Sequence, residues 1–352
     1  MFRWICATVT MVVSALGSLG VAGPQSRSKA VPAHLQRYKL AELVLKPTGR
    51  VGNFDGHAVE CPKVFRYGQR WYMAYTGIAK RDGVVHESIG LCESDDLVHW
   101  QGRRQILGPG NPGAFDHGGL SGPFTWVEGK RVYTMYCGFP RPGYETRPGL
   151  HGLAWTDDLK TWHKSPHNPV HRVGPKGGWN DNVVYQAFVM KHGGRYWMFY
   201  NAHGSKDNCE QIGVAFSDDL ITWGEHEHNP ILRKGDPKRD RDHVIIADPW
   251  VMRLAGKWHM FYFAYDGKHA RECLATSNDL LTWTKSPLNP IMDAGPPGSY
   301  DEIHCHKPCV IEHEGVFYHF TTSCGKRPDG SEYRAIGLAT SKRLKGVAYR
   351  ER

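Results

Sequence analysis

The chain has 352 residues, of which 40% are apolar and 22% charged, and its formal net charge at pH 7 is +9. This length and apolar content can supply the core of one large all-β domain or of two ordinary domains, and they exclude a disordered chain. Scattered basic residues argue against a nucleic-acid partner, whereas the positive excess either favours an anionic partner, such as a sulfated or uronate-bearing glycan, or reflects only a solvated surface.

The N-terminus has the pattern of a secretory signal. Met1-Phe2-Arg3 precedes an uncharged stretch that is rich in Ala, Val, Leu and Gly and contains the small-residue sequence Val21-Ala22-Gly23. We predict a signal peptide over residues 1–23, which makes the mature protein secreted or periplasmic and free of the membrane; an uncleaved membrane anchor is the alternative. Eight cysteines would then remain in an oxidising compartment, but their spacing indicates neither zinc binding nor a set of four disulfides.

One unit recurs five times along the rest of the chain. Each copy opens on an Asp, passes through a Gly turn and continues into an aromatic strand such as Tyr196-Trp197-Met198-Phe199-Tyr200. The copies start at Asp55, Asp116, Asp181, Asp242 and Asp301, so that successive starts are 61, 65, 61 and 59 residues apart. A repeat of this length with several short strands is typical of a propeller blade.

A second element recurs in step with the first, as in Ser217-Asp218-Asp219-Leu220-Ile221-Thr222-Trp223, and it predicts a turn between two strands of each blade. We therefore predict an all-β, five-bladed β-propeller with about four antiparallel strands per blade, in a single domain over residues 24–352. The last unit lacks this element, so its outer strand comes either from residues 347–349 or from the N-terminal residues 38–45. A β-sandwich of short strands would not explain the period.

The repeated Asp suits a structural role, since every blade carries it and a carboxylate can accept backbone N–H bonds where a loop enters a strand. Two other carboxylates break the repeat at the opening of the inner strands. Glu60 stands where the other units carry Ser121, Gln186, Ala247 and His306, and Asp248 stands where they carry Cys61, Gly122, Ala187 and Lys307. Two carboxylates on different blades are what glycoside hydrolysis requires, one as general acid and one as base or nucleophile.

These motifs resemble those of the five-bladed propeller glycosidases of families 43, 32 and 68, together with the related mannoside phosphorylases and neoagarobiose hydrolases. Glu60-Cys61-Pro62 is similar to the motif of the general acid, and Asp248-Pro249 to that of a catalytic Asp. The resemblance implies that Glu60 is the acid and that Asp248 is either the base or the carboxylate that tunes the acid. The order of the motifs around the ring departs from the family, and this leaves Asp181 and His306 as alternative catalytic residues. Strand alternation also places Glu60 and Asp248 on opposite sides unless a bulge re-aims one of them.

Other polar and aromatic residues at the strand openings are expected to bind the sugar. They are Asp55, His57, His117, Trp179, Glu302 and His304. No cofactor is required for this chemistry, although the ring of Asp and His side chains could hold a divalent metal in the channel.

The sequence thus predicts a secreted glycoside hydrolase that acts on an oligo- or polysaccharide. A non-catalytic carbohydrate-binding propeller and a glycoside phosphorylase remain alternatives, the latter with Arg147, Arg172 or Lys307 as phosphate ligands. The recurring turn is similar to the Asp-box of sialidases, but it lacks that motif's Gly, and five units rather than six argue against that class. The choice of sugar depends on two loops without a readable pattern, residues 141–149 and 201–208.

Overall fold

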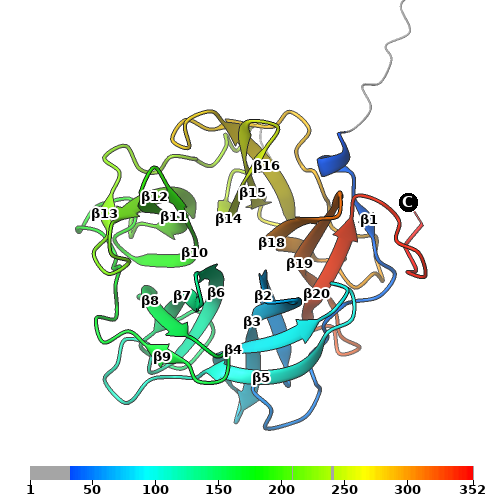
Figure 1. Cartoon of the computed structure of the whole chain (residues 1–352), viewed down its shortest axis with the longest axis horizontal. Helices are drawn as coiled ribbons and strands as arrows, with labels where there is room; N and C mark the ends of the chain where they lie inside the picture. The colour runs from blue at the N-terminus through cyan, green and yellow to red at the C-terminus, as the bar shows by residue number, and fades with distance from the viewer. Residues whose placement is uncertain (1–31, 208, 239–241, 352) are drawn as a thin grey trace, which may run out of the picture. The chain divides into compact units, whose positions relative to one another are not determined.

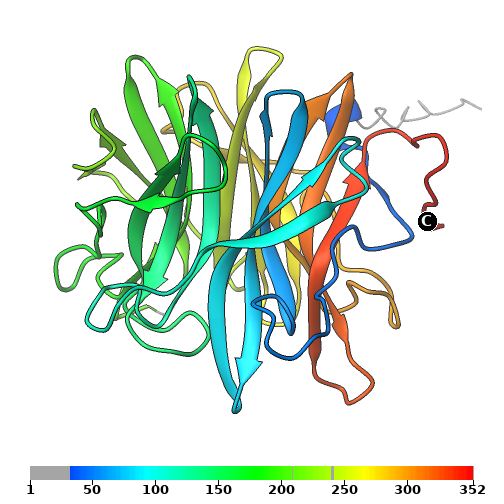
Figure 2. The same ribbon diagram turned by 60° about the horizontal axis from the view of Figure 1, so that its bottom comes forward.

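The computed structural model describes residues 32–351 except 208 and 239–241, so the predicted signal peptide lies outside the described residues. Five four-stranded antiparallel sheets stand around a central axis, as Figure 1 shows in a view along it and Figure 2 in a tilted view. The predicted five-bladed, all-β propeller is confirmed. Apart from strands, the described part contains one 3-10 helix, η1 (Ala33–Leu35), and it has no helix that is long and apolar enough to span a membrane.

The four blades that are continuous in sequence follow one pattern, with the first strand nearest the axis. Blade 1 consists of β2 (Ala58–Tyr67), β3 (Arg70–Arg81), β4 (Val84–Ser94) and β5 (Gln101–Leu107); blade 2 of β6 (Gly119–Glu128), β7 (Arg131–Phe139), β8 (Leu150–Thr156) and β9 (His163–Lys164); blade 3 of β10 (Val183–His192), β11 (Arg195–His203), β12 (Gln211–Ser217) and β13 (Gly224–Glu225); blade 4 of β14 (Ile245–Leu254), β15 (Lys257–Tyr265), β16 (Ala270–Ser277) and β17 (Thr284–Lys285).

The N-terminal segment closes the ring. Blade 5 takes β18 (His304–His313), β19 (Val316–Lys326) and β20 (Glu332–Thr340) from the end of the chain and β1 (Tyr38–Lys39) as its outermost strand. β1 pairs antiparallel with β20, and Leu40 forms a further bridge with Tyr349. Of the two candidates for this strand, the N-terminal one is therefore confirmed, while residue Tyr349 of the other lies directly beside it.

The recurring turn is built from side-chain oxygens, as predicted. In blade 1, Ser94 Oγ accepts the N–H of Leu97, and Asp96 Oδ1 accepts those of Val98 and His99. A buried leucine in the left-handed region, with φ between 60° and 69°, occupies the centre of each copy: Leu97, Leu159, Leu220 and Leu280. A β-branched residue would be strained at this position, so the turn fixes a leucine side chain in the core between blades.

The repeated Asp ties the inner and outer strands together in blades 1, 2, 4 and 5. Asp116 accepts a hydrogen bond from Tyr136 on the second strand at 3.0 Å. It also forms an ion pair with Lys164 on the fourth strand at 2.5 Å. The other cations that pair with this position are Arg103 with Asp55, Lys285 with Asp242, and Lys39 and Arg350 with Asp301. This is the structural role that the sequence favoured.

Blade 3 differs from the sequence alignment by one residue. The position that contacts the tyrosine of the second strand is held by Asn180, whose Nδ2 lies 3.2 Å from Tyr200 Oη. Asp181 instead accepts N–H bonds from Gly177 and Ser205 in the preceding and following loops. The repeat therefore aligns Gln186, rather than Ala187, with Asp248. An Asp next to an Asn made the shift invisible in the sequence.

A bulge interrupts each inner strand near the channel. The shifts in pairing lie between Glu60 and Lys63, Ser121 and Phe124, Val184 and Ala187, Ala247 and Trp250, and His306 and Cys309. In four blades the residue before the bulge proline has a positive φ between 55° and 61°: Cys61, Gly122, Asp248 and Lys307. The bulge adds a residue to the strand and so removes the alternation that would have placed Glu60 and Asp248 on opposite sides.

Candidate active site

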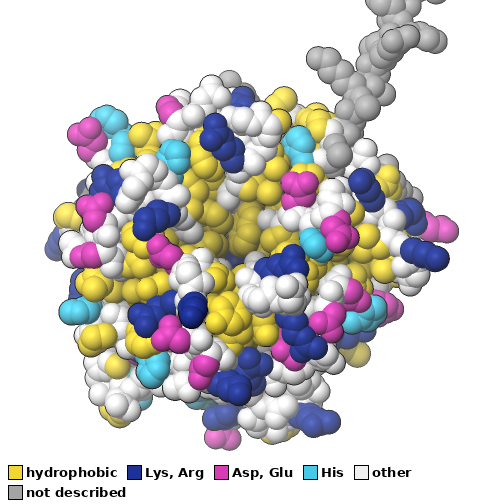
Figure 3. All heavy atoms as spheres, in the orientation of Figure 1, with side chains coloured by type: hydrophobic (Ala, Val, Ile, Leu, Met, Phe, Trp, Pro, Cys, Tyr) yellow, Lys and Arg dark blue, Asp and Glu magenta, His cyan; other side chains and the backbone are white. Residues whose placement is uncertain are grey.

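A pocket of about 190 Å³ opens at the channel between blades 2 to 5. Figure 3 shows the face of the ring seen in Figure 1, which is hollowed at its centre and surrounded there by hydrophobic side chains. The pocket is lined by three carboxylates, Glu145, Glu210 and Asp248; by the basic or imidazole side chains of Lys307, Arg334, His304 and His306; and by Tyr144, Tyr185, Gln186, Asn201, Ile245, Phe263, Tyr265 and Ala270. A concave site with convergent polar groups is the default location for catalysis.

Glu60 lies behind this pocket and is fully buried. Its Oε1 is 3.4 Å from Lys307 Nζ, its Oε2 is 2.6 Å from an Arg334 guanidinium nitrogen, and Tyr144 donates to it at 3.2 Å. Burial by itself would raise the pKa of Glu60, but Lys307 and Arg334 outweigh it and hold the pKa at about 2. A carboxylate in this environment stays ionised, so the structure does not support the general-acid role implied by the resemblance.

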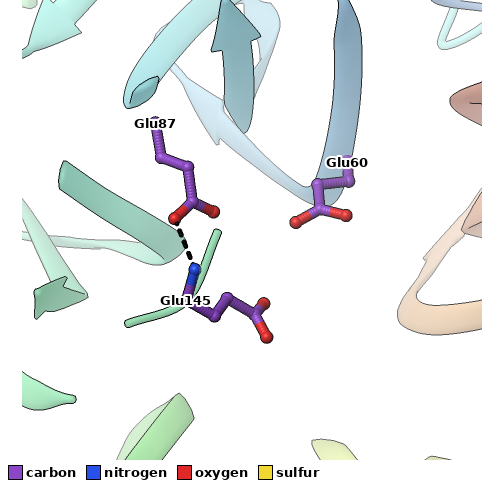
Figure 4. Close-up of side chains that lie close together, drawn as sticks. All are labelled: Glu60, Glu87 and Glu145. Carbon is purple, nitrogen blue, oxygen red and sulfur yellow. Dashed lines mark hydrogen bonds between the residues drawn. The ribbon is translucent and has the colours of Figure 1, made fainter. Parts of the chain in front are cut away.

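Two further glutamates converge on Glu60. Figure 4 shows Glu87, from β4, and Glu145, from the loop between β7 and β8, pointing toward the same space as Glu60. Glu145 N donates to Glu87 Oε2 at 3.0 Å, and oxygens of all three carboxylates lie within 4.8 Å of one another. Burial, followed by the charges of Glu145 and Glu60, raises the pKa of Glu87 well above its ordinary value, so Glu87 is held protonated.

This cluster has the ligand chemistry of a divalent-metal site, but a protein cation already pairs with two of its carboxylates. Lys307 Nζ lies 3.4 Å from Glu60 and 3.3 Å from Glu145, and thus supplies positive charge between two of the three carboxylates. The His side chains of the predicted metal ring are not part of the cluster. The described residues therefore do not fit the predicted ring of Asp and His ligands.

Glu210 and Asp248 line the same pocket and are linked through Asn201. Asn201 Nδ2 donates to Glu210 at 2.5 Å, and the backbone N–H of Asp248 donates to Asn201 Oδ1 at 3.2 Å. Burial, together with the charges of Glu145 and Asp248, raises the pKa of Glu210 to about 8. Burial also raises the pKa of Asp248 to about 6, against the opposing effect of Lys307 and Lys63.

The two fifth-blade histidines line the pocket as neutral side chains. His306 Nδ1 lies 3.1 Å from the carbonyl oxygen of Thr322, an acceptor, so Nδ1 carries the proton. Burial and the neighbouring Lys307 lower the pKa of His306 well below its ordinary value. His304 Nδ1 accepts the N–H of Ala270, and burial lowers its pKa as well. In this neutral form His306 Nε2 can only accept a hydrogen bond, so His306 is a poor general acid at neutral pH.

The other residues predicted from the strand openings do not line this pocket: Asp55, His57, His117, Trp179, Asp181 and Glu302. His117 contacts the carbonyl of Gly110, and Glu302 accepts the N–H of Gly298. Trp179 packs on Tyr200 with ring centroids 5.6 Å apart. These side chains shape the loops and the blade core, because a residue that opens a strand lies one loop away from the channel.

The functional residues at the beginning of the third strands were missed in the sequence analysis. In each blade, one equivalent residue of the second strand pairs with a glycine or a cysteine of the third strand. The residues three positions before these partners, in blades 1 to 5, are Glu87, Gly149, Glu210, Ala270 and Arg334. This position varies in charge from blade to blade, whereas the repeat would predict one residue type. The variation was readable in the sequence. Tyr144 and Glu145, by contrast, come from a loop without a pattern.

Comparisons with known proteins agree with this architecture. The model of the family "Glycosyl hydrolases family 43" matches residues 35–272. Rv1502, an uncharacterized protein of Mycobacterium tuberculosis, is 25% identical over 281 residues, which are 77% of this chain and 90% of that protein. A beta-1,2-mannobiose phosphorylase of Thermoanaerobacter sp. is 28% identical over 120 residues, 30% of this chain and 38% of the relative.

Among solved structures, BT0996 in an RGII complex superposes with a TM-score of 0.72 at 27% identity, over 87% of this protein and 93% of BT0996 as solved. Because the family model spans more than half of the chain, the protein belongs to glycosyl hydrolases family 43 and is a glycosidase.

Proposed function

We propose that this glycosidase hydrolyses its substrate with Glu210 as the general acid. The observation that carries the proposal is the raised pKa of Glu210, about 8, at the surface of the pocket. A glycosidase needs one carboxyl group that keeps its proton at neutral pH and can deliver it to the leaving oxygen. Asn201 fixes the orientation of this group by donating to it.

Glu145 is the second catalytic carboxylate in this proposal. It lines the same pocket, forms an ion pair with Lys307 at 3.3 Å, and raises the pKa of Glu210 more than any other neighbouring charge does. A glycosidase divides the acid and the base or nucleophile roles between two carboxylates of one site. Asp248 tunes Glu210, since its charge also raises the pKa of the acid. This keeps one of the two roles that the resemblance implied for Asp248.

Glu60 acts as a positioning residue in this scheme. Its carboxylate holds Lys307, Arg334 and Tyr144 at the edge of the pocket through direct contacts. Lys307 in turn contacts Glu145. Removing the Glu60 charge would therefore free the groups that orient the second carboxylate.

A phosphorylase is the second candidate, and the similarity to a mannobiose phosphorylase favours it. Phosphorolysis replaces one carboxylate by a bound phosphate, which needs basic side chains. The two basic side chains of the described pocket, Lys307 and Arg334, both pair with Glu60, and this supports hydrolysis. Their pairing also favours a neutral sugar over the anionic glycan that the net charge suggested.

The test is release of sugar from a panel of nitrophenyl glycosides and neutral or sulfated oligosaccharides, with and without inorganic phosphate. Hydrolysis in phosphate-free buffer that is lost in Glu210→Gln supports the proposal. Turnover only with phosphate, with a sugar phosphate as the product, would establish the phosphorylase. Binding of an oligosaccharide without any turnover would indicate a non-catalytic carbohydrate-binding propeller.

Export is a further part of the proposal and has the N-terminal sequence of residues 1–23 as its support. N-terminal sequencing of the protein recovered from the medium or periplasm of its host tests it. A mature chain that begins near residue 24 is the expected result.

A further inference from the structure

Blade 3 lacks the ion pair that ties each of the other blades together. Where they carry an Asp and a cation, blade 3 carries Asn180 and Glu225, with Asn180 Nδ2 2.5 Å from Glu225 Oε1. Tyr200 also donates to this oxygen at 2.8 Å. The exchange of cation for carboxylate leaves the negative charge of Glu225, whose side chain is 31% exposed, beside the buried His171 at the boundary between blades 2 and 3.

Two stacked histidines of blade 2 lie against this carboxylate. His151 and His171 occupy positions that hold Ile212 and Leu232 in blade 3, and both are buried. Their Nδ1 atoms are 3.0 Å apart, with the rings nearly parallel at 15°. His171 Nε2 lies 3.3 Å from Glu225 Oε1. At the other end, His151 Nε2 contacts the carbonyl oxygen of Tyr185.

Counting protons along this row shows that the neutral pair is incomplete. A carbonyl and a carboxylate only accept, so both Nε2 atoms need a proton, and the Nδ1 to Nδ1 bond needs a third. Two neutral imidazoles carry two protons. All three bonds form only when one ring is an imidazolium, and His171 is the ring that faces Glu225. Tyr200 is a further titratable side chain that contacts the pair, and its ring meets both histidines edge-on.

The far end of the row reaches the pocket. Tyr185 lies in the bulge of β10 and lines the site beside Gln186. The bulges of the other four blades contain a proline, which restricts the backbone, whereas that of blade 3 consists of Tyr185-Gln186 and has none. The contact of His151 with the Tyr185 carbonyl holds this backbone, together with the bond of the Val184 N–H to the Gly149 carbonyl and the contact of Gln186 Nε2 with Cys61 Sγ.

We infer that His151 and His171 are positioning residues that share one extra proton, with His171 as a buried imidazolium paired to Glu225 and His151 anchoring the Tyr185 carbonyl at the catalytic pocket. The inference rests on the proposed function in that Tyr185 must border the reacting sugar. When the row loses its third proton, one of its hydrogen bonds is lost, and the Tyr185 segment is no longer held.

The first test needs no substrate. Nitrogen NMR of the ¹⁵N-histidine-labelled protein at neutral pH reports which ring nitrogens carry protons. We expect both His171 nitrogens to be protonated and His151 to be protonated at Nε2 alone. Glu225→Gln removes the counterion and should return His171 to the neutral form at the same pH. Two neutral histidines in the unmutated protein would overturn the inference, whatever the outcome of the activity assays.

The second test transplants the apolar pair of the neighbouring blade as His151→Ile/His171→Leu. Ile212→Val/Leu232→Val, which makes a modest packing change at the equivalent site, is the matched control. The histidine replacement should keep the unfolding temperature and lower kcat/KM for a nitrophenyl glycoside by about 10- to 100-fold, the usual cost of a misplaced pocket residue. The control should leave kcat/KM within about two-fold. Unchanged kcat/KM in a folded His151→Ile/His171→Leu protein would reject the positioning role while leaving the glycosidase assignment intact.

Discussion

Lys307 Nζ lies 3.4 Å from Glu60 Oε1, although the two residues are 247 positions apart in the chain and belong to blades 5 and 1. These blades meet where the ring closes. The same ammonium contacts Glu145 from blade 2 at 3.3 Å. Closure of the propeller and assembly of the site therefore share one buried cation.

Replacement of Lys307 should destabilise the fold. Lys307→Met leaves Glu60 and Glu145 without this counterion, and breaking a buried pair costs about 3–5 kcal/mol. Urea unfolding measures the change. Lys191→Met, which removes an exposed ion pair with Glu128, is the control and should cost less than about 1 kcal/mol. Equal stability of the two variants would show that Lys307 is not a structural counterion.

Loss of the general acid should depend on the leaving group. Glu210→Gln can keep the Asn201 contact but cannot deliver a proton, so kcat for an oligosaccharide should fall by about 10²- to 10⁴-fold. A dinitrophenyl glycoside needs no protonation, and its kcat should fall far less. Glu302→Gln, in a loop outside the pocket, is the control. Equal losses on both substrates would move the acid role to another residue.

The pH profile of kcat/KM should have an alkaline limb near the pKa of Glu210, about 8, because activity is lost as the acid gives up its proton. Asp248→Asn removes a negative charge that raises this pKa, so the limb should shift to lower pH. Asp181→Asn, which changes a carboxylate outside the pocket, should leave the limb in place. A limb that stays fixed in Asp248→Asn would contradict the tuning role.

Glu87→Gln should stabilise the protein at neutral pH. The folded state holds the pKa of Glu87 well above its ordinary value of 4.5. A group with a raised folded-state pKa lowers stability as pH rises above the unfolded value, since the unfolded chain ionises more readily. The glutamine can accept the same N–H from Glu145 without this penalty. The gain, measured by thermal unfolding, should shrink as the pH falls toward 4.5; a constant gain would point to packing instead.

Removal of divalent ions should not affect the enzyme. Lys307 supplies the positive charge inside the Glu60, Glu87 and Glu145 cluster, where a metal would otherwise bind. Activity and unfolding temperature are expected to be the same before and after dialysis against EDTA. A loss that calcium or magnesium restores would assign this cluster to a metal. Lys307→Met provides the complementary measurement, because it opens the space to an ion.

The repeat determined most of the fold in advance. Five Asp-led units, each with a Gly turn and an aromatic strand and four of them with an Asx-rich turn, predicted five blades of four strands, and these local signals act within a short stretch of chain. The shift at Asn180 and Asp181 escaped notice because both residue types open a strand equally well. What distinguished them was a contact with Tyr200, twenty residues away.

The site depended far more on tertiary structure. The sequence by itself identified Asp248, His304 and His306 as residues of the channel, since repeat-breaking polar residues are visible in an alignment of the units. Only the structure separated Glu60, ion-paired with Lys307 and Arg334 behind the pocket, from Glu210 and Glu145 at its surface. The protonation state of a carboxylate depends on burial and on charges within a few ångströms, and here those charges arrive from other blades and from an unpatterned loop.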